Sequence, residues 1–395
     1  MLVRAGDLLK ALQFLHAASS ALGSKYFANY FSLESENGLL RMRTSSPNGA
    51  AEATIEPTDE GEPISVVTTT KIFRLLQFIP QSTDIELIPD EGEIKIRADR
   101  STWHIPLMNV EAPFMPELPE EAALAILEVA GKWGMFQSFL SAVAPYTEGS
   151  GSYQQPSVYF QIDPTEGICY GVGTNRAEAL IERIPVEANG QAEILLPYET
   201  LKPIINKVTP SRVEIYRSGA KFVGETWWLY VPALSLEIAD QRRFRRIYEK
   251  VNDETIRISL ALDRTELLLA MQRLQALADL SGAVKYMTGS IEVHIQPYSE
   301  REIHLSSYAL GGTLLSEEVI PTAEAVVWPE DIEPPLRIGS KSIQNALNTF
   351  NKSSVVHLDF AYDSDRKSPT IARVTSPLQP HREVYFALLM KGESS

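Results

Sequence analysis

Three short stretches of the chain repeat one arrangement of apolar residues. Residues 71–79, KIFRLLQFI, place apolar side chains at the i, i+3, i+4 and i+7 positions that form one buried face of an α-helix. The same offsets recur in TLKPIINKV at 200–208 and in SIQNALNTF at 342–350. We therefore predict three equivalent amphipathic helices, with buried faces made by Ile72, Leu75, Leu76 and Ile79, by Leu201, Ile204, Ile205 and Val208, and by Ile343, Ala346, Leu347 and Phe350.

The sequence before each stripe repeats as well. Each copy begins with a short apolar stretch that we predict to be a strand, at 1–6, 125–131 and 256–262. A first amphipathic helix follows, with its apolar face made by Leu8, Leu9, Leu12 and Leu15, by Met135, Phe136, Phe139 and Ala142, and by Leu267, Leu268, Met271 and Leu274. Asp7 and Asp263 stand where the N-caps of two of these helices are expected.

Strand patterns occupy the rest of each copy. Hairpins are predicted at 30–46, 158–174 and 291–307, the first with Glu-Asn-Gly as its turn. A strand then leads into the second helix, and further hairpins follow that helix at 84–108, 212–234 and 355–390. This order predicts an α+β fold, with antiparallel sheets that carry their helices on one face.

The repeat spacing, close to one third of the 395 residues, predicts three tandem domains rather than a solenoid of small units. Two polar segments supply the boundaries, the Pro- and Glu-rich APFMPELPEEA at 112–122 and the charged RRFRRIYEKVNDE at 242–254. We place the domains at 1–122, 123–252 and 253–395.

Charge changes the picture of the helices. The net charge of −15 argues against a generic nucleic-acid coat, which would be basic. The helical stretches 71–79, 200–208 and 341–352 nevertheless carry Lys or Arg and no acid. If these helices lie on one surface, that surface would be polar to basic and could contact phosphates. The alternative is that these lysines and arginines simply lie on solvated helix faces. Because aromatic platforms are few, we expect contact with duplex rather than single-stranded DNA.

Catalytic and metal-binding motifs are missing from the sequence. The lone Cys169 allows no disulfide within the chain and indicates a reducing, cytoplasmic compartment. No pair of histidines has metal-ligand spacing, and neither phosphate-binding loops nor a nucleophile elbow occur. We expect no cofactor, no metal, no catalysis, no signal peptide and no membrane span.

Four segments, in this order, resemble the bacterial sliding clamp, the β subunit of DNA polymerase III. LLKALQFLHAASSALGSK at 8–25 resembles the opening helix and loop of that family, and GTNRAEALI at 173–181 its Thr-Asp-Gly-His-Arg-Leu motif. FRRIYEK at 244–250 resembles its Tyr-Arg-Arg-Val segment, and VYFALLMK at 384–391 its C-terminal strand. The resemblance implies a head-to-tail homodimeric ring, with helices lining a hole that encircles duplex DNA. Such a ring is a processivity factor that tethers a polymerase, a clamp loader and other replication or repair proteins through short peptide motifs.

Residue roles follow from this resemblance and from the helix faces. The expected DNA-contacting residues are Lys25, Lys71, Arg74, Tyr153, Gln154, Lys202, Lys207 and Lys341. The expected dimer-interface residues, for which ordinary core is the alternative, are Trp103, Ile105, Leu277 and Ala278. The expected partner-peptide pocket comprises Gln155, Thr174, Arg176, Ala177, Ala179, Leu180, Arg246, Ile247, Phe386, Ala387 and Leu388.

The sequence also departs from the family pattern. Arg176-Ala177-Glu178 replaces Gly-His-Arg, no proline precedes Phe244, and Leu388-Leu389 replaces Met-Pro. These changes leave the partner choice open and suit a divergent clamp, for instance from a phage or a plasmid. The alternatives are a three-domain β-rich scaffold without a DNA ring, and a hydrolase with paired carboxylates on a β scaffold.

Overall fold

The structure is a computed structural model that describes residues 1–21, 30–59, 61–108, 119, 121–147, 156–175, 178–205, 208–234, 251, 255–280, 291–308, 314–363 and 368–388. The chain divides into two compact units. Unit 1 consists of Met1–Ser141, Gln155–Tyr170 and Ile184–Leu236, and unit 2 of Ala142–Gln154, Gly171–Arg183 and Glu237–Ser395.

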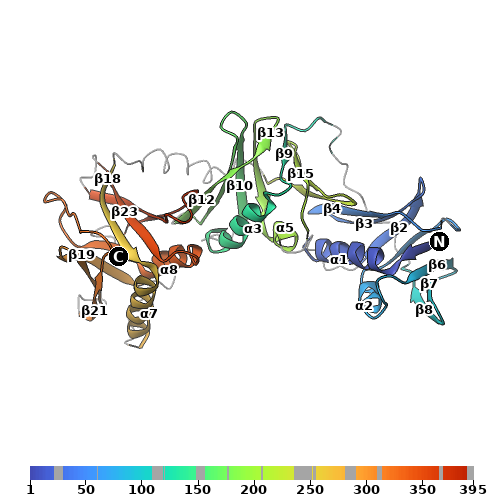
Figure 1. The fold of residues 1–395 in the computed structure, drawn as a ribbon, viewed down its shortest axis with the longest axis horizontal. Helices are drawn as coiled ribbons and strands as arrows, with labels where there is room; N and C mark the ends of the chain where they lie inside the picture. Colours follow the sequence, from blue (N-terminus) through green and yellow to red (C-terminus); the bar gives the residue numbers. More distant parts are fainter. Residues whose placement is uncertain are drawn as a thin grey trace. The chain divides into compact units, whose positions relative to one another are not determined.

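A nine-stranded antiparallel sheet forms the centre of unit 1 (Figure 1). In spatial order its strands are β13 (Glu187–Ala188), β9 (Ala125–Glu128), β15 (Arg212–Ile215), β16 (Gly219–Val223), β17 (Trp227–Pro232), β4 (Gly49–Ile55), β3 (Leu39–Ser46), β2 (Tyr30–Glu36) and β5 (Ser65–Thr69). The pairing of β17 with β4 joins strands of the first two sequence repeats into one sheet. Asn37 and Gly38 form the β2–β3 turn with φ of 54° and 75°, as the predicted Glu-Asn-Gly turn requires.

One face of this sheet is apolar and packs on helices. Alternate residues of β3, β4 and β17 point to that face, and Met42, Ala51 and Leu229 are buried there. Helix α1 (Ala5–Ala21) lies across β3 and β4, and the ring of its Phe14 is 4.8 Å from that of Trp227. The buried α1 side chains Leu8, Leu12 and Leu15 confirm the first predicted stripe.

In the part of the chain that is described, the second repeat adds two helices to unit 1. Phe139 of α3 (Trp133–Ala142) packs 5.8 Å, ring to ring, from Phe160 of β10 (Ser157–Asp163). β10 pairs with β14 (Ala192–Pro197), and β14 runs directly into α5 (Tyr198–Ile205). The strand-to-helix order predicted around residue 200 is therefore confirmed.

A smaller four-stranded sheet completes unit 1. It contains β1 (Leu2–Arg4), β6 (Asp84–Asp90), β7 (Glu93–Ala98) and β8 (Ser101–Pro106), with β8 at one edge. The helix predicted at 71–79 is shorter than expected, since α2 spans Ile72–Leu76. Beyond it the amides of Gln77, Phe78 and Ile79 donate to the carbonyls of Phe73, Leu75 and Leu76, so the turn continues and Ile79 is still buried.

Unit 2 contains two antiparallel arrays. In the first, β12 (Glu178–Pro185) pairs with β25 (Arg382–Ala387), followed by β24 (Ser368–Thr375), β23 (Val355–Asp363) and β18 (Ile256–Asp263), while β11 (Ile168–Thr174) precedes β12 in the chain. The second has the order β21 (Leu314–Pro321), β20 (Glu302–Tyr308), β19 (Glu292–Ser299) and β22 (Leu336–Gly339).

Within the described residues, unit 2 has three helices. They are α4 (Ala144–Thr147), α7 (Arg264–Leu280) and α8 (Ser340–Thr349), and α7 contacts α8 (Figure 1). All four residues of the third predicted stripe, from Ile343 to Phe350, are fully buried. Hydrophobic burial along this stripe therefore fixes α8 to its sheet.

The two predicted N-caps have different outcomes. Asp263 directly precedes α7, and its Oδ1 accepts the amide hydrogen of Glu266 at 2.8 Å, which confirms it as an N-cap. The prediction for Asp7 was wrong, because α1 begins at Ala5 and Asp7 lies inside its first turn. A carboxylate there still interacts favourably with the helix N-terminus.

Candidate nucleic-acid and partner-binding surfaces

Two cations project from the short helix α2 in unit 1. Lys71 at its N-cap and Arg74 one turn later are both exposed, whereas Ile72 and Leu76 are buried on the opposite side. Among the residues that the structure describes, no acidic side chain forms an ion pair with either cation. Exposed cations of this kind can attract an external anion.

Helix α1 extends this surface. Its exposed positions include Asp7, Lys10 and Gln13. α2 is held against α1 by His16, whose Nδ1 lies 3.0 Å from Oγ1 of Thr70 and whose ring is 4.7 Å from that of Phe73. We name the exposed side of these packed helices the α1–α2 face, defined by Lys10, Gln13, Lys71, Arg74 and Gln77.

The remaining predicted DNA contacts are only partly described. Lys341 is exposed in the first turn of α8 in unit 2. The structure describes the backbone of Lys202 in α5 but not its side chain. Four further predicted residues lie outside the described residues, namely Lys25, Tyr153, Gln154 and Lys207.

The prediction of three acid-free helices needs one correction. The stretch 200–208 carries no acid, but α5 begins at Tyr198 and so includes Glu199, which is exposed. The helix starts earlier than its apolar stripe because β14 ends at Pro197 and leads straight into it. α2 and α8 carry no acidic residue within their bounds.

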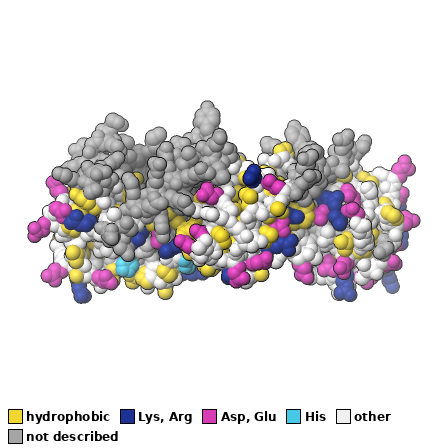
Figure 2. Space-filling model, turned by 90° about the horizontal axis from the view of Figure 1, so that it is seen from above, with side chains coloured by type: hydrophobic (Ala, Val, Ile, Leu, Met, Phe, Trp, Pro, Cys, Tyr) yellow, Lys and Arg dark blue, Asp and Glu magenta, His cyan; other side chains and the backbone are white. Residues whose placement is uncertain are grey.

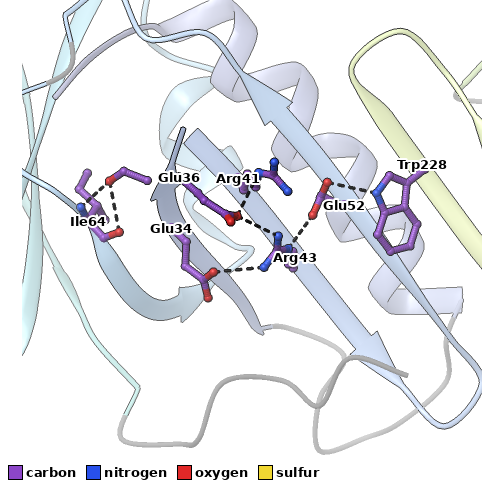
Figure 3. Close-up of polar contacts among 8 residues, drawn as sticks. Glu34, Glu36, Arg41, Arg43, Glu52, Ile64 and Trp228 are labelled. Atoms are coloured by element: carbon purple, nitrogen blue, oxygen red, sulfur yellow. Dashed lines mark hydrogen bonds and ion pairs between the residues drawn. The ribbon is translucent and has the colours of Figure 1, made fainter. Parts of the chain in front are cut away.

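On the sheets, in contrast, most cations are neutralised by acids. Arg43 of β3 is held by Glu52 at 2.5 Å and by Glu34 at 3.2 Å, and Arg41 lies 3.3 Å from Glu36 (Figure 3). Where residues are described, acidic and basic side chains are interspersed in the space-filling view (Figure 2). The sheet surfaces thus combine charges of both signs, whereas the cations of the α1–α2 face have no acidic partner among the described side chains.

Unit 2 brings six residues of the predicted peptide pocket near the β12–β25 pair. The register runs from Glu178 opposite Phe386 to Glu182 opposite Arg382. The six described residues are Thr174 at the end of β11, Ala179 and Leu180 on β12, and Phe386, Ala387 and Leu388 at the end of β25. The other pocket residues, Gln155, Arg176, Ala177, Arg246 and Ile247, lie outside the described part of the chain.

The six residues do not share one face of the sheet. Leu180 and Phe386 are fully buried on the side of Glu178, whose carboxylate accepts hydrogen bonds from Ser342 at 2.6 Å and Asn345 at 3.1 Å on α8. Ala179 and Ala387 alternate with them and point to the opposite side, where Ala387 is exposed. Leu180 and Phe386 therefore lie on the side of the sheet where Glu178 bonds to α8, and Ala387 is accessible on the other side.

The buried ion pair of Glu182 and Arg382, at the β12–β25 pair, was not predicted from the sequence. The guanidinium of Arg382 donates to Oε2 of Glu182 at 2.8 Å, and both side chains are almost fully buried. Arg382 also donates to the carbonyl of Thr349 at 3.3 Å, and the hydroxyl of Thr349 lies 3.0 Å from that of Tyr146. Charged residues that alternate along a strand usually indicate a solvated face. The sequence pattern therefore did not predict that the end of α8 covers the charged face of β12 and β25.

Burial controls the titration of this cluster. It raises the pKa of the Glu182 carboxyl, and the facing Arg382 guanidinium opposes that rise. Burial, together with the nearby charges of Arg382 and Arg183, lowers the pKa of His381, whose Nε2 lies 3.5 Å from Glu182. Both effects favour the neutral imidazole over the imidazolium.

Within the described ranges, no three His, Cys, Asp or Glu side chains gather as metal ligands would. None of the helices described has the length and apolarity needed to cross a membrane.

Comparison with solved structures finds the same fold in bacterial β clamps. A Helicobacter pylori beta clamp matches with a TM-score of 0.76 and 15% identity, over 99% of this chain and 100% of that one. The DNA polymerase III subunit beta from Pseudomonas aeruginosa matches with a TM-score of 0.76 and 12% identity, with the same coverage. A Helicobacter pylori beta clamp bound to a DNA ligase peptide matches with a TM-score of 0.71 and 14% identity, over 99% of both chains. No protein-family model and no curated protein matches the sequence. The chain thus has the α+β fold of the β clamps over its whole length.

Proposed function

We propose that this chain, folded as a β clamp, is a sliding clamp that encircles duplex DNA and tethers a replicative polymerase to it. The observation that carries this proposal is the full-length match to β clamps, which covers 99% of this chain and 100% of each of the two clamps. The exposed cations of the α1–α2 face support it, because a net charge of −15 would otherwise oppose contact with DNA. Enclosure of the duplex, rather than tight binding, retains such a protein.

Three tandem domains, at 1–122, 123–252 and 253–395, are part of the proposal. The repeated order of elements supports them: β1 leads into α1, β9 into α3 and β18 into α7. β5, β14 and β22 lead in the same way into α2, α5 and α8. Each copy would supply two main helices to the inner surface of the ring.

The proposed ring is a head-to-tail homodimer. Trp103 and Ile105 lie on one face of the edge strand β8, and both are partly exposed. On α7, Leu277 is 45% exposed whereas Ala278 is fully buried, so Leu277 is the member of that pair available to a second copy. An edge strand with exposed apolar residues is a ready template for pairing with another chain.

DNA contact is assigned to Lys25, Lys71, Arg74, Tyr153, Gln154, Lys202, Lys207 and Lys341. The exposure of Lys71, Arg74 and Lys341 supports this assignment. Contacts of this kind go to phosphates and carry no sequence information, which suits a protein that slides.

The binding of partner peptides is assigned to the residues around the β12–β25 pair. A Helicobacter pylori clamp of the same fold has been solved with a DNA ligase peptide, and short peptide motifs of a polymerase and a clamp loader would bind this chain similarly. The pocket would comprise Gln155, Thr174, Arg176, Ala177, Ala179, Leu180, Arg246, Ile247, Phe386, Ala387 and Leu388. With Leu180 and Phe386 buried, the exposed Ala387 is the described residue best placed to touch a peptide.

The proposed clamp is non-catalytic, needs no cofactor and works in the cytoplasm at the nucleoid. The experiment that tests it loads the protein onto nicked circular DNA with a clamp loader and then linearises the DNA. A sliding clamp stays on circles and leaves unblocked linear DNA, and its solution mass is about twice 44.0 kDa. Equal retention on circular and linear DNA would refute topological tethering, and no DNA association at all would favour a scaffold protein.

A further inference from the structure

Phe78 has the highest exposure of any large apolar side chain in the described part of the chain, at 86%. It follows α2 in a turn that remains helical, since its amide donates to the carbonyl of Leu75 at 3.1 Å. At helical spacing, positions 71, 74 and 78 lie on one side. Phe78 therefore completes an exposed strip that begins with Lys71 and Arg74.

The fold does not need a phenyl ring at this position. The core side of the same turn is already filled by Ile72, Leu76 and Ile79, all of them buried. Exposure of a phenyl ring to water is unfavourable, and contact with a ligand would remove that exposure. Phe78 stands beside Lys71 and Arg74, for which the described residues include no acidic ion-pair partner. A ligand that matches the whole strip must offer negative charge to Lys71 and Arg74 and a flat apolar face to Phe78.

Unpaired nucleotides have both properties. Every base has a π-face on which an aromatic side chain can stack, and every nucleotide carries a phosphate for a neighbouring cation. In an intact duplex the base faces are already covered by stacking, and a side chain reaches them only by wedging base steps apart. The strip thus fits single-stranded DNA better than duplex, contrary to the expectation from the low aromatic content of the sequence.

We propose that the Lys71–Arg74–Phe78 strip binds single-stranded DNA, with the Phe78 ring stacked on an unpaired base and the two cations on adjacent phosphates. This inference rests on the proposed clamp function and extends it. A clamp with such a strip favours a primer–template junction, where single-stranded template leaves the duplex, over an uninterrupted duplex.

The test compares two fluorescein-labelled DNAs by anisotropy at low salt, using the full chain. One is a blunt duplex, and the other is the same duplex with a single-stranded 5′ extension. The unmodified protein should bind the extended DNA at least about fivefold more tightly, the lower end of what one stacked base contributes. Phe78→Ala should abolish that preference, and Phe78→Tyr should keep it because the ring remains. Tyr298→Ala, which removes a ring 64% exposed on β19 of unit 2, is the matched control and should also keep the preference.

Three outcomes overturn the inference. In the first, Phe78→Ala retains the preference for extended DNA, and in the second it weakens binding to both DNAs equally. In the third, Phe78→Ala loses binding only to anionic phospholipid vesicles, which would assign the strip to a membrane surface. The circle-retention experiment separates this failure from that of the clamp proposal: a protein that stays on circular DNA without any junction preference refutes only the role of Phe78.

Discussion

The indole nitrogen of Trp228 donates a hydrogen bond to Oε1 of Glu52, 3.1 Å away, and so links β17 to β4 across 176 positions of sequence. The other oxygen of Glu52 accepts from Nε of Arg43 on β3 (Figure 3). Glu52 is 8% exposed, and its two partners lie directly opposite it in the strand register. One buried carboxylate thus connects three strands at the place where two sequence repeats meet.

Replacing this carboxylate should destabilise unit 1. Glu52→Ala leaves the Trp228 N–H without its acceptor, and Arg43 keeps only its more exposed partners Glu34 and Glu36. We expect the free energy of unfolding to fall by about 1–3 kcal/mol. The matched control is Glu187→Ala, whose side chain is 81% exposed and lies 3.3 Å from Lys132, outside the Arg43 network. The control should cost less than about 0.5 kcal/mol. Urea unfolding followed by tryptophan fluorescence measures both, and equal losses would show that Glu52 contributes nothing beyond a surface pair.

The ion pair of Glu182 and Arg382 should behave as a coupled unit. Arg382→Met leaves a buried carboxylate without its cation, with an expected loss of about 3–5 kcal/mol. Adding Glu182→Leu should recover a large part of that loss, because the remaining apolar pair has no uncompensated charge. A double-mutant cycle by chemical unfolding measures the coupling. Additive losses from the two substitutions would mean that the pair does not interact energetically.

Cys169 should be unreactive in the folded protein. The thiol is 1% exposed, and burial raises its pKa to about 12, so almost no thiolate forms at pH 8. It also lines a small apolar cavity of unit 1 with Trp133 and Phe136. Labelling with a chromogenic disulfide reagent should be very slow in buffer and complete in denaturant. Rapid labelling of the native chain at pH 8 would show that this core opens readily.

Much of the fold could be predicted because the spacing of apolar residues along the chain indicates the helices and strands. Stripes at helical spacing located the helices around Leu12, Ile72 and Ile343, and all three residues are buried. The Asn37-Gly38 turn fixed the register of the first hairpin in the same local way. The pairing of β17 with β4 was not predicted, because strands so distant in sequence are matched by tertiary packing and leave no local pattern.

The functional surfaces were less predictable for a related reason. The exposure of Lys71 and Arg74 could be predicted, because they lie opposite the apolar stripe of their helix. The exposure of Phe78 could not, because an apolar residue beside such a stripe is usually part of the core. Glu182 alternates along β12 as a solvated residue would, yet the end of α8 covers its partner Arg382. The pattern of a single sequence predicts which side of a helix or strand is apolar. It does not predict which other element packs on the polar side.

The dimer proposal gives a prediction about mass. Trp103→Glu places a charge on a partly exposed apolar position of the proposed interface, and Leu277→Asp places one on an exposed position. Either substitution should shift the solution mass from about twice 44.0 kDa to the monomer value. Tyr298→Glu, at an exposed aromatic outside this interface, should leave the dimer intact. Sedimentation at micromolar concentration measures all three. If the two interface variants remain dimeric, the chains associate through another surface.

Phosphate contact by the α1–α2 face should be visible in the salt dependence of DNA binding. Each phosphate neutralised contributes about 0.9 to the slope of log K against log salt, so Lys71→Ala with Arg74→Ala should reduce that slope by about 1.8. The matched control is Arg100→Ala at the β7–β8 turn, an exposed arginine for which the described residues include no ion-pair partner. This substitution should leave the slope unchanged, because Arg100 lies in a turn between two strands and not on the helices. Anisotropy titrations of a blunt duplex over a range of salt concentrations give the slopes. Equal reductions for the helix and sheet variants would mean that DNA is attracted by the general field of the protein and not by this face.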